Sequence, residues 1–258
     1  MSAGPELQKL AKTLDVPVER LEFLAGVPAE DLKVLRQQVA ESLFRAGKPA
    51  FARVAALSKT VPVGVSAKLT EAALPPLLAA RTAELLEPAK AAELVSKVSE
   101  GYLADVSARM DAARAPEVIA AIPPAKVATV GLELARRGEW VVIGGFVSHV
   151  STDALRASIA NYDGEQLLRI AFVMDDLSRV DAVGELLSDT QLDEIVAAAP
   201  AHGLWQEITS LLDHLAAPRL ARIGARYGAA SAEVHAAYDA AVAAGELDAA
   251  ELDRLRTP

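Results

Sequence analysis

Apolar residues recur along the chain with a period of 37 residues between Leu78 and Ala225. Four consecutive blocks result, 78–114, 115–151, 152–188 and 189–225, and each has the pattern of a pair of short helices. One position is apolar in every block and is occupied by Leu85, Ile122, Ile159 and Val196. A fixed period in this range is typical of stacked helical arrays, in which each unit buries its apolar face only against its neighbours.

Proline and capping residues mark helix starts along the whole chain. Before the blocks, a helix is expected to follow Pro28 and to end near Arg45, with Gly47-Lys48-Pro49 as its stop. The apolar positions of this helix keep helical spacing and are Leu32, Leu35, Val39 and Leu43. After the blocks, residues 231–244 and 246–255 are expected to form two helices that cap the array.

These patterns predict an all-α protein, a superhelical α-solenoid of short paired helices of about 10 to 14 residues with very short connections. An irregular helical bundle is the alternative, because some apolar columns align at any period in an Ala- and Leu-rich helical chain. We expect residues 1–60 to form a helical N-terminal subdomain or the first turns of the stack. Residues 61–225 would then be the repeat array, and residues 226–258 its capping helices.

Some of the helix starts share a short signature. Leu86-Glu87-Pro88-Ala89-Lys90-Ala91-Ala92-Glu93-Leu94 is one such start, and Ile122-Pro123-Pro124-Ala125-Lys126-Val127-Ala128 is another. This signature resembles the cytosolic N-terminal domain of MgtE-type bacterial magnesium transporters, over at most residues 74–224. The resemblance implies a HEAT-like, right-handed superhelix of short helices. We expect neither the transporter's membrane part nor its nucleotide-sensing module here, and no metal-binding residue carries over.

Composition narrows the possible functions. Half of the residues are apolar, aromatic residues are scarce and the formal net charge is −9, which does not favour nucleic-acid binding. Residues 1–60 carry nine Lys or Arg against seven Asp or Glu, whereas the remainder carries seventeen against twenty-eight. The chain has no cysteine, no signal peptide and no run long enough to span a bilayer, so we expect a cytoplasmic protein without membrane insertion. The most apolar run, 140–147, is expected to be a buried helix.

No catalytic motif stands out. The histidines form no close ligand pair; they are His149, His202, His214 and His235. Ser148 and Ser210 lack a nucleophile elbow, and Gly144-Gly145 is not a phosphate loop. The candidate metal ligands are Asp175, Asp176 and Asp181, the densest local acidic group, although an Asp pair near the end of an apolar helix is also explained as a solvated helix end. We therefore expect no enzymatic activity and no cofactor.

The two tryptophans are assigned different roles. Trp140 lies in the most apolar run and is expected in the core, whereas Trp205 is expected to be partly exposed and is the candidate partner-binding residue. The sequence thus predicts a non-enzymatic scaffold that binds a protein or peptide partner. Because the net charge of the chain is negative, a basic partner would be favoured electrostatically. The alternatives are a divalent-cation-responsive regulatory module and a carrier of a small apolar ligand between helices.

Overall fold

The computed structural model describes residues 4–58 and 61–256, and these residues form helices without any strand. The all-α class is therefore confirmed. Contacts divide the chain into two compact units, unit 1 (Met1–Ser158) and unit 2 (Ile159–Pro258), so the division falls within α10 (Thr152–Ile159). The three regions expected from the sequence stay a prediction.

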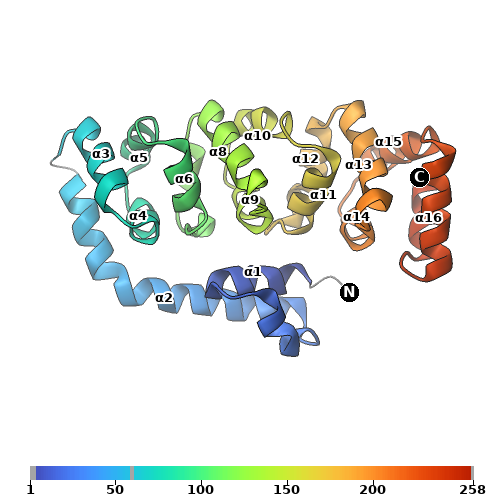
Figure 1. Cartoon of the computed structure of the whole chain (residues 1–258), viewed down its shortest axis with the longest axis horizontal. Helices are drawn as coiled ribbons and strands as arrows, with labels where there is room; N and C mark the ends of the chain where they lie inside the picture. Colours follow the sequence, from blue (N-terminus) through green and yellow to red (C-terminus); the bar gives the residue numbers. More distant parts are fainter. Residues whose placement is uncertain (1–3, 59–60, 257–258) are drawn as a thin grey trace. The chain divides into compact units, whose positions relative to one another are not determined.

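Helix bounds follow the chain as in Figure 1. Unit 1 contains α1 (Pro5–Leu14), η1 (Val18–Leu24), α2 (Ala29–Ser58), α3 (Val63–Ala73), α4 (Pro76–Ala83), α5 (Pro88–Val95), α6 (Glu100–Ser107), η2 (Ala112–Arg114), α7 (Pro116–Ala120), α8 (Pro124–Arg136), α9 (Trp140–Val147) and most of α10. Unit 2 contains α11 (Gly164–Phe172), η3 (Leu177–Arg179), α12 (Val180–Leu186), α13 (Asp189–His202), α14 (Trp205–Leu212), α15 (Ala217–Gly228), α16 (Ala232–Ala244) and α17 (Ala249–Arg256). The two helices expected after the repeat blocks are confirmed as α16 and α17.

Unit 1 begins with α1 packed against α2. Their shared core consists of Leu7, Leu10, Ala11, Leu21 and Leu32. At the edge of this core, the carboxylate of Glu6 accepts hydrogen bonds from Lys9 at 2.8 Å and from Arg36 at 3.1 Å. Glu6 and Lys9 are both buried, and pairing makes the burial of these charges tolerable.

The long helix α2 continues through Gly47-Lys48-Pro49, so the stop expected there is wrong. Pro49 has no N–H to donate to the carbonyl of Arg45, but both residues are exposed and water can take the place of the missing donor. The ring of Phe51 occupies the place where a Cβ on residue 47 would lie, so glycine lets the ring pack on the helix. Figure 1 shows α2 bending along its length, as expected for an internal proline.

Most of the α-helices described after α2 are shorter than the predicted 10 to 14 residues, and seven of them have eight residues. In unit 1, α3, α4, α5 and α6 begin at residues 63, 76, 88 and 100, so successive starts lie 12 or 13 residues apart. A 37-residue block therefore spans three short elements, and the expected pair of helices per block is wrong. Eight residues make only about two turns, so proline and capping residues set the boundaries more than hydrophobic periodicity does.

Several helices pack on the helix two positions further along the chain. In unit 1 these pairs are α3 with α5, α4 with α6, α5 with α7 and α6 with α8. In unit 2 they are α11 with α13, α13 with α15 and α15 with α17. Figure 1 shows α3 to α6 following one another in a zigzag that brings alternate helices side by side. Helices this short depend on neighbours for stability, because an isolated two-turn helix is marginal in water.

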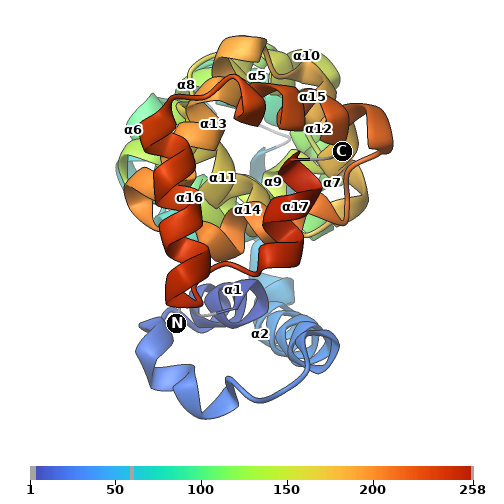
Figure 2. The ribbon, with the colours of Figure 1, turned by 90° about the vertical axis from the view of Figure 1, so that its right-hand side faces the viewer.

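Helix α11 approaches α13 closely at Gly164, the first residue of α11. A Cβ there would overlap the backbone of Glu194 and Ile195 in α13, so only glycine fits. Further along, the last two helices of unit 2 reverse direction at Gly245, as Figure 2 shows. Gly245 has a φ of 72°, a left-handed conformation that other residues adopt only with strain.

The two longest repeat-region helices end in the same way. Helix α8 is followed by Gly138 with a φ of 70°, and α13 by Gly203 with a φ of 64°. In both cases a tryptophan two residues later, Trp140 or Trp205, begins the next helix. Arg137 follows the last residue of α8, where a cation interacts favourably with the helix dipole. The hydrogen bonds that Arg137 donates to Asp105 and Glu133 raise the pKa of its guanidinium.

Helix α9 corresponds to the most apolar run of the sequence. Val142, Ile143, Gly144 and Val147 are buried in it, which confirms the expected buried helix. Within the ranges that the structure describes, no helix combines the length and the apolar character needed to cross a membrane.

Candidate functional site

Two of the three candidate metal ligands accept backbone hydrogen bonds within unit 2. Asp176 is exposed and caps η3, accepting the backbone N–H of Ser178 at 3.1 Å. Asp181 accepts the backbone N–H of Ala216 at 2.9 Å. Asp175 is half-buried in the turn after α11. Throughout residues 4–58 and 61–256, no group of three or more acidic or histidine side chains is arranged to hold a metal ion.

Trp205 lies in the interior of unit 2, so the exposure expected for it is wrong. Only 9% of the residue is exposed, and its indole N–H donates to Glu246 at 3.1 Å. Its ring meets that of Tyr238 edge-on with centroids 5.1 Å apart. Trp140, expected in the core, is only half-buried. Both tryptophans follow a helix-ending glycine, so this position does not predict which of them is buried. Trp205 is buried because α16 and the turn after it cover its side chain.

Tyr238 is the centre of this aromatic cluster. It is fully buried, its hydroxyl donates to the carbonyl of Val196 at 3.1 Å, and its ring also meets Tyr227 edge-on at 5.1 Å. Burial raises the pKa of the Tyr238 hydroxyl, so it stays a donor at neutral pH. The cluster joins α13, α14, α15 and α16 into one core and offers no open surface for chemistry.

A polar hollow of about 420 Å³ lies along α2 in unit 1. It is lined by Val34, Gln37, Gln38, Glu41, Ser42 and Arg45. These side chains supply amide, hydroxyl and charged groups that can both donate and accept hydrogen bonds. The hollow is open to solvent, so it can accommodate part of a larger molecule.

One wall of the hollow is connected to the rest of unit 1 through Arg114 of η2. Its guanidinium lies 2.8 Å from the carboxylate of Glu41 and 4.4 Å from the ring centre of Phe44, a cation–π contact. The hydrogen bonds from Arg114 and then from Arg45 lower the pKa of the Glu41 carboxyl. Arg114 thus holds one face of α2 against η2.

Arg114 is also connected, through Asp111, to the buried carboxylate of Glu84 at the end of α4. The Nε of Arg114 donates to Asp111 at 3.0 Å, and the backbone N–H of Asp111 donates to Glu84 at 2.9 Å. Arg81 donates to the same Glu84 oxygen at 2.7 Å. The other oxygen, Oε2, is buried and has no hydrogen-bond partner in the part of the chain described. Burial raises the pKa of this carboxyl despite the lowering effects of the Asp111 N–H and of Arg81.

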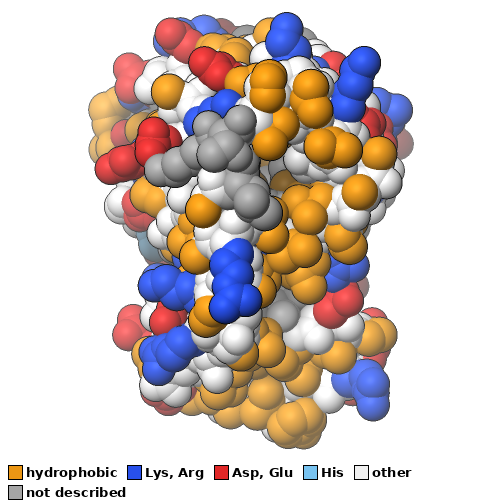
Figure 3. All heavy atoms as spheres, turned by 90° about the vertical axis from the view of Figure 1, so that its left-hand side faces the viewer, with side chains coloured by type: hydrophobic (Ala, Val, Ile, Leu, Met, Phe, Trp, Pro, Cys, Tyr) orange, Lys and Arg blue, Asp and Glu red, His pale blue; other side chains and the backbone are white. Residues whose placement is uncertain are grey.

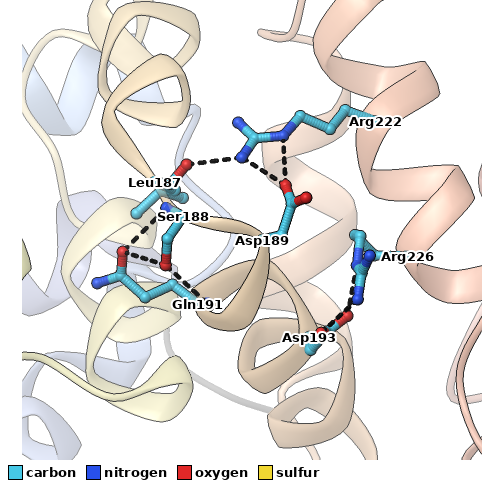
Figure 4. A network of polar contacts seen from close by, with 7 residues as sticks. All are labelled: Leu187, Ser188, Asp189, Gln191, Asp193, Arg222 and Arg226. Carbon is cyan, nitrogen blue, oxygen red and sulfur yellow. Dashed lines mark hydrogen bonds and ion pairs between the residues drawn. The ribbon is translucent and has the colours of Figure 1, made fainter.

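Unit 2 carries a different kind of polar network, in which each cation is matched by an acid (Figure 4). Arg222 of α15 donates to Asp189 at 2.6 Å and to the carbonyl of Leu187 at 2.9 Å. One turn later, Arg226 pairs with Asp193 of α13 at 2.6 Å, and this hydrogen bond lowers the pKa of Asp193. The network joins α15 to α13 and leaves no cationic group free for an anionic ligand.

The capping box at the start of α13 completes the network in Figure 4. Gln191 donates its backbone N–H to the hydroxyl of Ser188, and its side-chain oxygen accepts the backbone N–H of Ser188. The Gln191 amide also donates to the carbonyl of Ile159 at 2.7 Å. These contacts fix the start of the helix that carries Asp189 and Asp193.

Large apolar side chains are exposed in one part of unit 1. Among the described residues these side chains belong to Leu14, Phe23, Val34, Leu35, Leu43, Val65, Leu69 and Leu77. Phe23 is 77% exposed. Leu35 and Leu43, which helical spacing placed on one apolar face with Leu32, are 40% and 55% exposed, whereas Leu32 is buried. Spacing therefore identified the stripe on α2 but not which of its residues are covered.

No motif pointed to the Glu84 network, because its members are isolated charges from three separate elements. The sequence signal that could have suggested it is weak: a glutamate within an otherwise apolar stretch, 83–86. Comparison with protein-family models, with curated proteins and with solved structures found no match for this chain.

Proposed function

We propose that this chain is a non-enzymatic helical scaffold that binds a protein or peptide partner through unit 1. The observation that carries the proposal is that the large exposed apolar residues of the described ranges all lie between Leu14 and Leu77, on the first helices of unit 1. Single exposed apolar residues are normal on soluble proteins. A concentration of them in one region is typical of an interaction surface, because water is released when a partner covers it.

The arrangement of short helices supports the same proposal. Helices that pack on their second neighbours can expose long, continuous surfaces suited to a polypeptide. We propose that they belong to a right-handed α-solenoid with a repeated unit, as the resemblance to the N-terminal domain of MgtE-type transporters implies. This part of the proposal concerns architecture and implies no transport activity.

The charge of the chain is divided unequally between the units, and this bears on the partner. Unit 1 carries 19 Lys or Arg and 18 Asp or Glu, whereas unit 2 carries 7 and 17. The expectation of a basic partner rests on the acidic charge, which lies in unit 2. The exposed apolar residues lie in unit 1, so the partner's chemistry at that surface depends on the local charges of unit 1.

The proposal is tested by affinity capture with the wild-type chain and with the variant Phe23→Ser/Leu43→Ser/Leu69→Ser. A polypeptide that the wild type retains is then purified, and its binding to each of the two proteins is measured. All three side chains are more than half exposed, so the variant is expected to fold as the wild type does. We expect a polypeptide that binds the purified wild-type chain and loses most of its affinity for the variant. Equal binding by both proteins would contradict the proposal, as would the absence of any polypeptide that binds.

A further inference from the structure

Unit 1 begins with an arm that has a hydrophobic core of its own. We define the arm as residues 5–46, which comprise α1, η1 and the first part of α2. The buried residues of its core all belong to this range and are Leu7, Leu10, Ala11, Leu21 and Leu32. The partly buried residues packed against them, from Val16 to Val27, belong to the arm as well. The arm can therefore keep its fold when it moves relative to the helices that follow it.

Three ion pairs among the described residues join the arm to later parts of unit 1. They are Lys12–Glu139 at 2.6 Å, Asp15–Arg109 at 2.9 Å and Glu41–Arg114 at 2.8 Å. The arm contributes one cation and two carboxylates, and the complementary charges lie before α9, after α6 and in η2, so the pairs specify one docked position. All six side chains are partly exposed, that of Asp15 to 71%, so each pair is weak and is screened by salt.

The arm ends at Gly47-Lys48-Pro49, a triplet that weakens α2. Pro49 has no N–H to donate to the carbonyl of Arg45, so one helical hydrogen bond is missing there. Gly47 has no Cβ to restrict its backbone. Beyond the triplet Ala55 is buried, and α2 packs on α4. Since Figure 1 also shows α2 bending along its length, the triplet is the place where this helix bends most easily.

The docked arm covers an aromatic side chain. Phe44 is only 6% exposed, although its neighbours Leu43 and Arg45 are largely exposed. The guanidinium of Arg114 lies 4.4 Å from the centre of the Phe44 ring, and the centre of the Phe51 ring lies 5.8 Å away. Separation of the arm from η2 would uncover the face of Phe44 on which Arg114 lies.

We propose that the arm opens and closes: the three ion pairs hold it docked, residues 47–49 are its hinge, and opening exposes Phe44. Raised ionic strength favours the open arm, because it weakens all three pairs together. This inference concerns the conformation of unit 1 and does not rest on the proposed scaffold function.

Opening would also move a large part of the exposed apolar surface. Of the eight large apolar side chains exposed in the described ranges, five belong to the arm, namely Leu14, Phe23, Val34, Leu35 and Leu43. Figure 3 shows hydrophobic side chains over the lower part of one face, the level at which Figure 1 draws the arm. The position of the arm therefore determines how these side chains are presented to a partner.

The test uses the full chain, which contains no cysteine, so that two introduced cysteines can carry spin labels at chosen positions. Ala25→Cys places one label on the arm and Ala125→Cys the other on α8, and both alanines are exposed. Double electron–electron resonance then measures the distribution of distances between the labels, at salt concentrations from about 0.05 M to about 1 M.

We expect one narrow population of distances at low salt and a second, longer population that grows as salt weakens the ion pairs. Glu139→Lys should raise the ratio of open to docked arm about three- to tenfold at low salt, because two cations would then face each other. Lys12→Glu/Glu139→Lys restores an ion pair with exchanged signs and should return the ratio toward that of the wild type. Glu93→Lys, the same charge change at an exposed position of α5, should leave the ratio unchanged.

The hinge is tested by Pro49→Ala, in which alanine restores the missing N–H and stiffens α2. We expect the open population of this variant to cover a narrower range of distances, and an unchanged range would overturn the assignment of the hinge.

A single population at the same distance at every salt concentration would overturn the inference, and the salt series of the labelled wild type shows this without any charge variant. Equal rises in Glu139→Lys and Glu93→Lys would overturn it too, as would a Lys12→Glu/Glu139→Lys protein that stays as open as Glu139→Lys. Each of these results leaves the scaffold proposal intact, because that proposal is tested by capture of a polypeptide.

Discussion

Unit 1 and unit 2 are both built of packed helices, but their surfaces differ. Unit 2 contains no lysine, and its arginines pair with carboxylates along the helices, as Arg222 and Arg226 do in Figure 4. Its aromatic rings are packed around the buried Tyr238. In the part of unit 1 that the structure describes, Lys48, Arg53 and Lys68 are exposed and form no ion pair, and large apolar side chains are exposed as well. Under the proposed scaffold function, this difference is the reason to expect the partner at unit 1 rather than at unit 2.

The largest expected effect is in the core of unit 2. Tyr238→Ala removes a fully buried ring and should lower the free energy of unfolding by about 3–5 kcal/mol. Leu43→Ala in unit 1 removes an exposed side chain and should change it by no more than about 0.5 kcal/mol. Denaturant unfolding of both variants measures the contrast. Similar losses in the two variants would mean that Leu43 is covered in the free protein.

The second-largest effect on stability is expected at the contact between α11 and α13. Gly164→Ala places a methyl group against the backbone of Glu194 and should lower the free energy of unfolding by about 1–3 kcal/mol. Gly228→Ala, in α15, meets open space and should be neutral or stabilise by about 0.5–1 kcal/mol. Thermal unfolding of the pair provides the measurement. A neutral Gly164→Ala would show that the two helices are not held at this close distance.

The third prediction concerns the pH dependence of the free energy of unfolding, which we expect to depend on Glu84 in unit 1. Because the folded-state pKa of Glu84 is raised above the ordinary value of 4.5, the folded state retains a proton that the unfolded state has lost. The resulting stabilisation is complete below pH 4.5 and is lost as pH rises through the folded-state pKa. Glu84→Gln removes this titration, so its free energy of unfolding should fall less over the same range.

Unfolding of the wild type and of Glu84→Gln between pH 4 and pH 8 tests this difference, with Glu93→Gln as the exposed control. Asp193 and Glu41, whose pKa values are lowered, titrate in all three proteins, so their contribution cancels in the comparison. Parallel curves for all three proteins would contradict the assignment of a raised pKa to Glu84.

The smallest effect is expected at the surface of unit 2. Arg226→Ala breaks the pair with Asp193, which is open to solvent, so stability should change less than in Gly164→Ala. Added salt should reduce even this difference, because exposed ion pairs are screened. Melting temperatures of wild type and variant at low and high salt measure it. A large, salt-independent loss would show that the network is a main determinant of the packing of α15.

Local signals in the sequence predicted much of the helical architecture. Proline and capping residues located most helix starts, and the apolar run 140–147 correctly indicated the buried helix α9. The stop expected at Pro49 was wrong because a solvent-exposed helix tolerates one unpaired carbonyl, and because Phe51 packs over Gly47. The number of helices per block was wrong because a two-turn helix shows only about two periods of hydrophobic spacing, too few to mark where it begins and ends.

The candidate sites were harder to predict, because burial depends on contacts far apart in the sequence. Trp205 and Trp140 have the same local context, yet only Trp205 is covered by the C-terminal helices. The same limit applies to Glu84, whose carboxylate contacts Arg81 of its own helix but also Asp111, 27 residues further along the chain. Residue type and spacing gave no sign of either environment.

The most direct test of the central claim is hydrogen–deuterium exchange of the full chain with and without a captured polypeptide that binds the purified protein. The account predicts slower exchange in the complex within residues 14–77, with the strongest protection along α2 and α3. Unit 2 should exchange at the same rate in both states. Protection confined to residues 159–258, with none in 14–77, would contradict the claim that unit 1 carries the partner surface.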